Sequence, residues 1–123
     1  MSDPSASTLA GTRVLVCDAE GSMLGSPADA VDLIGAAGAL GAELVLVPLT
    51  RLDPAFFELA NRSAGEFLQK LVNYGLRLAV VGDVGPYVEH SKALADFVRE
   101  SNRGRQIWFV RDAAELEGRL GRS

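Results

Sequence analysis

Reactive side chains are expected to gather just after a buried strand in the middle of the chain. Residues 76–82 form a predicted strand with the apolar run Leu78-Ala79-Val80-Val81, Asp83 follows the strand directly, and Tyr87 and Lys92 come within reach of Asp83. Ligands of open α/β sheets bind beyond the carboxyl ends of the strands, near the point where the strand order reverses. These residues therefore predict a small-molecule site in which Asp83 anchors a ligand or acts as an acid–base group. The alternative is a loop aspartate that only accepts backbone amide hydrogen bonds.

A second polar group, Asn102-Arg103-Gly104, follows the helix predicted after Ser91. These residues either end that helix as a turn or direct Asn102 and Arg103 at an anionic ligand. A local run of positive charge comprises Arg99, Arg103, Arg105 and Arg111. We interpret this run as a solvated rim, and a phosphate-binding patch is the alternative.

The remaining titratable groups each allow a structural and a functional interpretation. Glu66 stands among apolar residues of a predicted helix, four positions after Arg62. An ion pair between them would be structural, whereas an unpaired buried carboxylate would be a functional candidate. Cys17 and His90 could form a nucleophile pair, but we favour a buried inert thiol and an exposed histidine.

No motif for a metal, a cofactor or phosphotransfer is complete. One histidine and one cysteine do not make a metal-ligand cluster, so no metal site is expected. The stretch Gly82-Asp83-Val84-Gly85-Pro86 departs from the dinucleotide fingerprint, and the chain has no P-loop lysine pattern, so no cofactor is expected. Residues 13–18 look like the first strand of a response-regulator receiver. That class needs an aspartate where Pro48 stands and a lysine where Arg111 stands, and we therefore reject it.

The elements that must position these residues alternate between strands and helices. Central strands are predicted at residues 13–17, 43–48, 76–82 and 106–110, with a short hairpin strand at 22–25. Helices are predicted from Ser26-Pro27 to the glycines at 38 and 41, from Asp53-Pro54 to Tyr74 with a possible break at 61–63, after Ser91, and after Asp112. This order predicts right-handed crossovers and a mostly parallel sheet of four to five strands with about four helices.

Length and composition fit one soluble domain. The chain has 123 residues, which we divide into a flexible tail at 1–12 and one α/β domain at 13–120. A net charge of −4 argues against a nucleic-acid partner. No apolar run is long enough for a membrane span, and residues 1–12 are not expected to be a secretory signal. A single cysteine suits a reducing compartment, so we expect a cytoplasmic protein without a membrane partner.

A set of short motifs runs through the chain from residue 56 to residue 104. The motifs begin with Phe56-Phe57-Glu58-Leu59 and continue with residues 64–70, Asn73-Tyr74, residues 78–83, Ser91-Lys92-Ala93-Leu94, Asp96-Phe97 and residues 100–104. Together they resemble a bacterial family, domain of unknown function 4180. The resemblance covers residues 13–120 and implies a bacterial, cytosolic protein. It implies no activity.

The predicted architecture is also similar to the STAS domains of anti-sigma-factor antagonists. The shared features are a hairpin start, a strand ending near Gly82-Asp83, and a last strand followed by a short helix. In that family a serine or threonine at the start of the second major helix is phosphorylated, and the added charge releases a partner. Asp53 stands near that place, and Ser63, the nearest serine, is expected well inside the helix. We therefore expect a STAS-like fold and not a phosphorylation switch.

Two functions from different classes follow from these observations. The first is a non-catalytic interaction or regulatory module that binds a protein partner or a second copy of itself. Its interface would comprise Phe56, Phe57, Gln69, Asn73 and Tyr74. The alternative is a small-molecule binding protein or enzyme, whose site at the sheet edge around Asp83 would comprise Asp83, Tyr87, Lys92, Asn102, Arg103 and Glu66.

Overall fold

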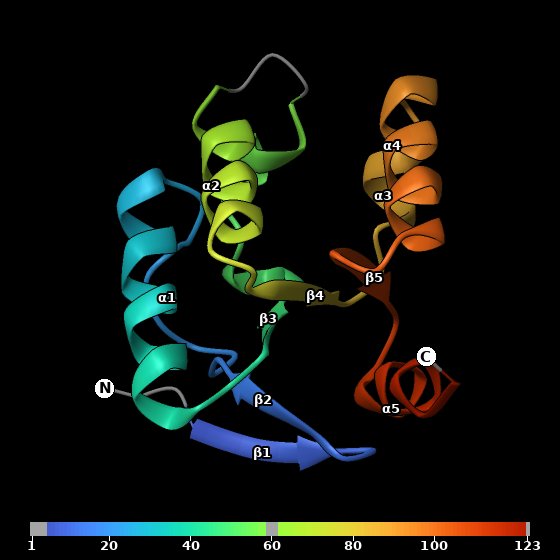
Figure 1. The fold of residues 1–123 in the computed structure, drawn as a ribbon. Helices are drawn as coiled ribbons and strands as arrows, with labels where there is room; N and C mark the ends of the chain where they lie inside the picture. Colours follow the sequence, from blue (N-terminus) through green and yellow to red (C-terminus); the bar gives the residue numbers. More distant parts are fainter. Residues whose placement is uncertain (1–4, 59–61, 123) are drawn as a thin grey trace.

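A single five-stranded sheet organises the computed structural model, which describes residues 5–58 and 62–122 (Figure 1). The strand order is β1-β2-β3-β4-β5, the same as the order along the chain. The strands are β1 (Ser5–Leu9), β2 (Thr12–Val16), β3 (Leu44–Pro48), β4 (Arg77–Val81) and β5 (Ile107–Val110). Strands β2 to β5 are parallel, and β1 pairs antiparallel with β2.

The predicted central strands lie side by side as expected. Val45 of β3 pairs with Leu78 of β4, and Leu78 in turn pairs with Ile107 of β5. The first four of the five positions of β3 are all buried, because helices cover one face of this strand and a second apolar layer covers the other. The small α/β class and the mostly parallel sheet are confirmed, whereas the STAS-like identity of the fold stays a prediction.

The helices divide unequally between the two faces of the sheet (Figure 1). Helices α1 (Pro27–Leu40), α2 (Arg62–Asn73), the single turn α3 (Gly85–Val88) and α4 (Lys92–Arg103) lie on one face, which we call the helical face. Right-handed crossovers between strands added in one direction place every connecting helix on the same side. Helix α5 (Ala113–Arg122) follows the last strand, connects to no further strand, and packs on the opposite face.

The amino-terminal prediction was wrong in two places. Residues 5–9, assigned to a flexible tail, form the edge strand β1, which turns into β2 through Ala10 (φ 48°) and Gly11 (φ 81°). Two residues with positive φ are the requirement of a tight hairpin turn. The expected hairpin strand at 22–25 is reduced to an isolated parallel bridge between Leu24 and Leu52. The hairpin therefore lies before the first central strand and not after it.

The long helix predicted at 54–74 is divided. A short 3₁₀ turn, η2 (Pro54–Phe57), begins at Asp53, and α2 begins at Arg62; residues 59–61, which include part of the predicted break, lie outside the described residues. Ser63 is consequently in the first turn of α2 and not well inside a helix. A second 3₁₀ turn, η1 (Leu49–Arg51), follows β3, and α3 occupies part of the loop expected at 83–89.

Candidate functional site

The residues expected at the carboxyl edge of the sheet have structural partners. Asp83 is exposed, and its Oδ1 accepts a hydrogen bond from the backbone N–H of Gly85 at 2.9 Å. The Tyr87 ring stacks on the Phe57 ring, with centroids 4.3 Å apart and planes at 20°. Asp83 thus makes the backbone contact that the structural interpretation expected, at the start of α3, and Tyr87 belongs to the aromatic packing beneath it.

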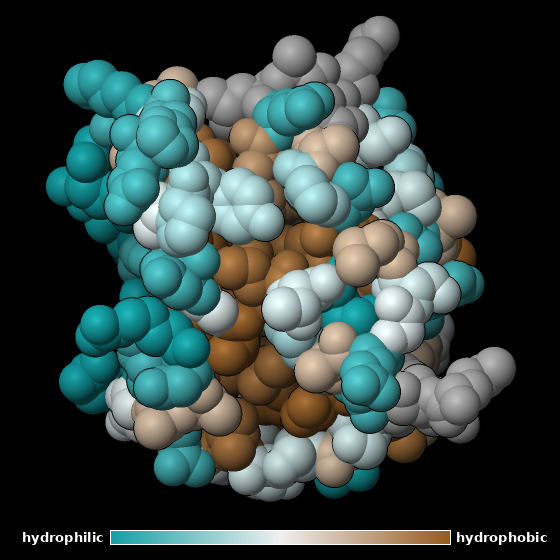
Figure 2. Space-filling model, turned by 180° about the vertical axis from the view of Figure 1, so that it is seen from behind, coloured by the Kyte–Doolittle hydropathy of each residue, from teal (hydrophilic) through white to brown (hydrophobic). Residues whose placement is uncertain are grey.

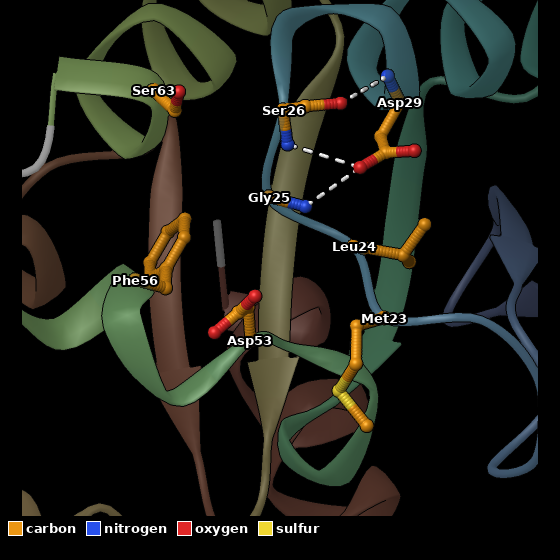
Figure 3. A pocket seen from close by; sticks show the side chains of 8 residues that line it. All are labelled: Met23, Leu24, Gly25, Ser26, Asp29, Asp53, Phe56 and Ser63. Carbon is orange, nitrogen blue, oxygen red and sulfur yellow. Dashed lines mark hydrogen bonds between the residues drawn. The ribbon is translucent and has the colours of Figure 1, made fainter.

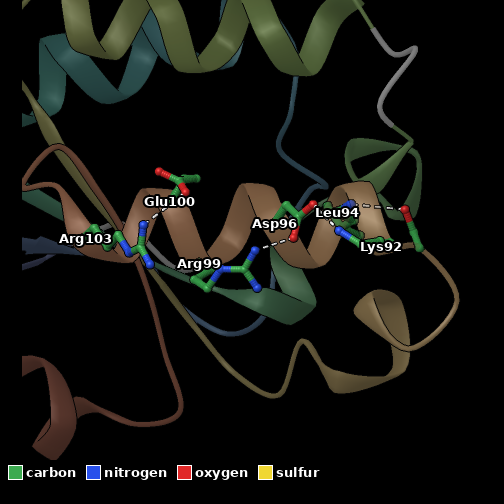
Figure 4. A network of polar contacts seen from close by, with 7 residues as sticks. Lys92, Leu94, Asp96, Arg99, Glu100 and Arg103 are labelled. Atoms are coloured by element: carbon green, nitrogen blue, oxygen red, sulfur yellow. Dashed lines mark hydrogen bonds and ion pairs between the residues drawn. The ribbon is translucent and has the colours of Figure 1, made fainter.

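Lys92 and Arg103 stand at opposite ends of α4, in surface ion pairs (Figure 4). Lys92 Nζ lies 3.1 Å from Asp96 Oδ2 with its side chain 89% exposed, and Arg103 contacts Glu100 at 3.3 Å. Hydrogen bonds from Lys92 and Arg99 lower the pKa of Asp96. Eleven residues of helix separate Lys92 from Arg103 by roughly 16 Å. These two side chains therefore do not meet in one site.

Asn102 is bound to the neighbouring strand. Its Oδ1 accepts from the backbone N–H of Phe109 at 2.7 Å, and its Nδ2 donates to the carbonyl of the same residue at 3.2 Å. Both functions of the amide are used by the fold, beside the third residue of β5. Asn102 is therefore bound to the edge of β5 and Asp83 to the loop after β4, so separate parts of the fold hold these two predicted ligand-binding residues.

The predicted interface residues also separate into two groups. Phe56 and Phe57 are only 7% and 9% exposed, and their rings meet edge to face with centroids 5.4 Å apart. They line an apolar groove of about 150 Å³ between α2 and α4. In the second group, Gln69 donates to Asn73 at 2.8 Å on the exposed side of α2, and Tyr74 beyond its end is 68% exposed.

Glu66 is exposed on α2. The side chain of Arg62, the partner expected for it, lies outside the described part of the structure. Neither Glu66 nor Asp83 lines the cavity beside Asp29 and Asp53 or the depression around Trp108. Glu66 is therefore not the buried carboxylate that would have favoured a functional role.

A cavity of about 370 Å³ opens at the carboxyl edge, above β2 and β3 (Figure 3). We call it the edge cavity. Its walls are the loop that precedes α1, the turn η2 and the first turn of α2, and it is lined by Met23, Leu24, Gly25, Ser26, Asp29, Asp53, Phe56 and Ser63. Two of these eight residues are acidic and none is basic. The Asp53 carboxylate reaches into the space between the Phe56 ring and the Gly25–Ser26 segment (Figure 3).

Hydrogen bonds to the loop before α1 hold Asp29 in its ionised form. Asp29 Oδ2 accepts from the backbone N–H groups of Gly25 and Ser26, each at 3.0 Å, while Ser26 Oγ accepts from the Asp29 N–H at 3.2 Å. Burial alone would raise the pKa of Asp29, but the bonds from Ser26 and Gly25 outweigh it and lower the pKa. The arrangement is a capping box, which fixes one wall of the edge cavity.

Asp53 is bound less completely than Asp29. Its Oδ1 accepts from the backbone N–H of Ala55 at 3.0 Å and so begins η2. Within the described residues, no hydrogen bond to its second oxygen is found. Asp53 therefore offers the edge cavity a carboxylate oxygen that is available to a ligand.

The sequence contains a signal for this cavity. Ser26-Pro27 and Asp53-Pro54 are both predicted as helix caps, and each follows a strand of the parallel pair β2 and β3. The carboxyl ends of neighbouring parallel strands share one edge, so two caps that follow them must lie close together. The prediction of a site at Asp83 assumed that the strand order reverses near it, but the observed order contains no reversal.

Cys17 is buried at the end of β2, with 4% exposure. Burial raises the pKa of its thiol, and the Arg51 charge opposes this shift. It lines a small cavity of about 160 Å³ with Asp18, Asp32 and Arg51, and His90 is not part of that lining. The Arg51 guanidinium donates to the carbonyl oxygens of Ser22 and Asp18 at 2.8 and 2.7 Å, so it closes the loop that follows β2.

Hydrophobic residues also gather on the outside of the molecule. Seen from behind, they occupy the middle of the surface, with hydrophilic residues densest along one side (Figure 2). On the sheet face that carries α5, Val14 is fully buried whereas Val16 is half-buried, and Ala79 and Val81 of β4 differ in the same way. Helix α5 therefore covers the amino half of that face more completely than the carboxyl half.

The fold and the edge cavity define a small α/β domain with a singly wound sheet. The chain belongs to the family described as Domain of unknown function (DUF4180), whose model matches residues 9–120. No curated protein and no solved structure gives a significant match. Among the described residues, no helix is long and apolar enough to cross a membrane, and no cluster of three or more metal-ligating side chains is found.

Proposed function

We propose that this domain is a non-catalytic interaction module whose edge cavity receives a lysine or arginine side chain of a protein partner. The observation that carries the proposal is the lining of the edge cavity: two carboxylates and two hydroxyl groups, with no basic residue among its eight members. A cationic group is the natural complement of such a lining, because charged hydrogen bonds to a carboxylate are about twice as strong as neutral ones.

The apolar part of the lining indicates which kind of chemical group carries the cation. Met23 is 51% exposed at the rim, and Phe56 presents its ring from the opposite wall (Figure 3). Lysine and arginine carry an apolar stem below the charged group, and such stems pack on apolar surface while the charge reaches a polar partner. The site therefore favours a basic side chain over a small inorganic cation.

The module is proposed as non-catalytic because its reactive groups are engaged in the fold. The Cys17 thiol is buried with a raised pKa, Asn102 uses its amide on Phe109, and Asp83 holds the Gly85 amide. The lone cysteine and the family resemblance support a cytoplasmic location. A second copy of the chain is an alternative partner, which native mass measurement would reveal as a dimer.

Selection of binding peptides from a random library tests the proposal without assuming the sequence of the partner. Peptides displayed on phage would be selected on the full chain, and the enriched peptides would be measured by calorimetry against Asp53→Asn and Asp83→Asn. The two variants are matched, since each aspartate is exposed and accepts one hydrogen bond from the N–H two residues on. We expect lysine or arginine next to an apolar residue, with about tenfold weaker binding to Asp53→Asn only. Acidic or unbiased peptides, or equal weakening by both variants, would contradict the proposal.

A small cationic metabolite is the second candidate, because the volume of the edge cavity falls in the range of small-ligand sites, about 300 to 1,000 Å³. Titration with agmatine separates the two. Saturable binding of agmatine alone, weakened by Asp53→Asn, would favour the metabolite. Binding only of a basic residue that has peptide chain on both sides, and not of agmatine, would favour the protein partner.

A further inference from the structure

The indole of Trp108 is held in place at the amino edge of the sheet, at the opposite end from the edge cavity. Its Nε1 donates to the carbonyl of Gly104 at 2.7 Å, and the residue is 3% exposed. The guanidinium carbons of Arg77 and Arg119 each lie 4.6 Å from the centre of its ring. Two cations are thus fixed on one aromatic side chain, where cation–π attraction stabilises each of them.

Further arginines surround this tryptophan. A shallow depression of about 380 Å³ is lined by Arg105, Trp108, Glu115, Arg119 and Arg122. Three of these five residues are cationic and one is acidic, although the chain as a whole has a net charge of −4. Oε1 of Glu115 accepts from the backbone N–H of Arg111 at 2.7 Å, so that carboxylate is already bound at the start of α5.

Positive charge in this region is not balanced by the fold. Arg77 Nε donates to the carbonyl of Arg105 at 2.6 Å, and Arg77 Nη2 is buried without a hydrogen-bond partner among the described residues. Burial lowers the pKa of Arg77, and the Arg105 charge lowers it further, against a weaker opposing effect of Glu43. Within the described part of the chain, neither Arg105 nor Arg122 forms a side-chain ion pair, unlike Arg99 and Arg103 on α4. A bound anion would relieve this repulsion.

We propose that Arg105, Arg119 and Arg122, around Trp108, form a binding site for a compact oxyanion of the phosphate type. The planar guanidinium group offers paired N–H donors whose spacing matches two oxygens of a phosphate. Arg119 is already positioned by a hydrogen bond to the Asn102 carbonyl and by the Trp108 ring. Arg105 and Arg122 are exposed and line the same depression, where their guanidinium groups can bind the ligand. This site is independent of the edge cavity.

The single tryptophan of the chain reports on this site directly. The full chain would be titrated with inorganic pyrophosphate at constant ionic strength while the Trp108 fluorescence is followed, with inorganic phosphate and succinate as further probes. We expect a saturable change with pyrophosphate and with phosphate, and weaker or no binding of succinate. Arg105→Ala and Arg122→Ala should each weaken pyrophosphate binding about tenfold or more, since each removes a charged hydrogen-bond donor.

Arg111→Ala is the matched control. It removes the same charge from an exposed position at the other end of β5, and it should leave the affinity unchanged. Melting temperatures of the three variants show that each is folded. A signal that never saturates, that sodium chloride reproduces, or that falls equally in Arg111→Ala would overturn the site. Succinate binding as tight as that of pyrophosphate would overturn the assignment to phosphate-type anions.

Discussion

The side-chain amide of Asn102 occupies the position of a missing neighbouring strand beside Phe109. It receives the N–H of Phe109 at 2.7 Å and donates to the carbonyl of the same residue at 3.2 Å, on the free edge of β5. An unpaired strand edge is a template for association with other chains. Asn102 therefore satisfies and blocks the middle of this edge, and the Glu115 carboxylate does the same for the Arg111 N–H.

Replacing Asn102 by alanine should destabilise the domain and expose the edge of β5. The buried backbone groups of Phe109 would lose both partners, at a cost of about 1 to 3 kcal/mol in the free energy of unfolding. Urea denaturation measures the loss, and light scattering at raised protein concentration measures association through the edge. Asn102→Asp keeps the acceptor and loses the donor, so it should cost less than alanine at neutral pH. An alanine variant as stable as the parent would show that the contact is unimportant.

The capping box of α1 should make stability depend on pH in a defined direction. The pKa of Asp29 is lowered in the folded state, so its ionised form contributes stability above the unfolded value of about 3.9. That contribution is lost as the pH falls through the lower folded value. Asp29→Asn should therefore cost about 1 kcal/mol at pH 7 and progressively less below about pH 4.

Ser26→Ala provides the comparison for Asp29→Asn. It removes the hydroxyl that accepts from the Asp29 N–H, and it should cost about 1 kcal/mol. Since the Ser26 side chain is only one of several groups that lower the pKa of Asp29, this cost should depend less on pH than that of Asp29→Asn. Thermal unfolding of both variants between pH 3 and 7 gives the two profiles. Parallel profiles for the two variants would show that the Asp29 carboxylate is not the titrating group.

The glycine at the end of β4 should not accept a side chain. Gly82 has a φ of 154°, and a Cβ added there would lie 2.5 Å from the Cβ of Leu49. Gly82→Ala should destabilise the domain by about 2 to 4 kcal/mol through backbone strain and overlap. Gly65→Ala is the control, because an added Cβ meets nothing within 4 Å on α2 and should stabilise by about 0.5 to 1 kcal/mol. Equal effects of the two changes on the melting temperature would refute this account.

The Cys17 thiol should be unreactive in the folded protein. Burial raises its pKa, and only the thiolate is a nucleophile, so a disulfide reagent at pH 8 should modify it far more slowly than in urea. A chain in which Cys17→Ala is combined with Ser22→Cys places the single thiol at an exposed position and should react at once. Fast modification of the folded parent would indicate that the end of β2 opens readily.

Local patterns anticipated most of the elements but not their boundaries. The runs Leu44-Val45-Leu46-Val47 and Leu78-Ala79-Val80-Val81 identified buried parallel strands, because strands covered on both faces are apolar throughout. The capping serine and aspartate before proline located the starts of α1 and η2. The edge strand β1 was missed because Ser-Ala-Ser-Thr-Leu has neither the hydrophobicity nor the alternation of a covered strand; pairing with β2 holds it.

By itself, the sequence determined the α/β class, the central strands and the family, since apolar runs, caps and glycines act over a few residues. Tertiary structure alone decided which polar groups meet. It bound Asp83 to the loop after β4 and Asn102 to the edge of β5, joined Asp29 to Asp53 in one cavity, and gathered Arg105, Arg119 and Arg122 around Trp108. The physical reason is the strand order: crossovers that all run in one direction leave no central crevice, so side chains distant in sequence meet only where the loops of neighbouring strands share an edge.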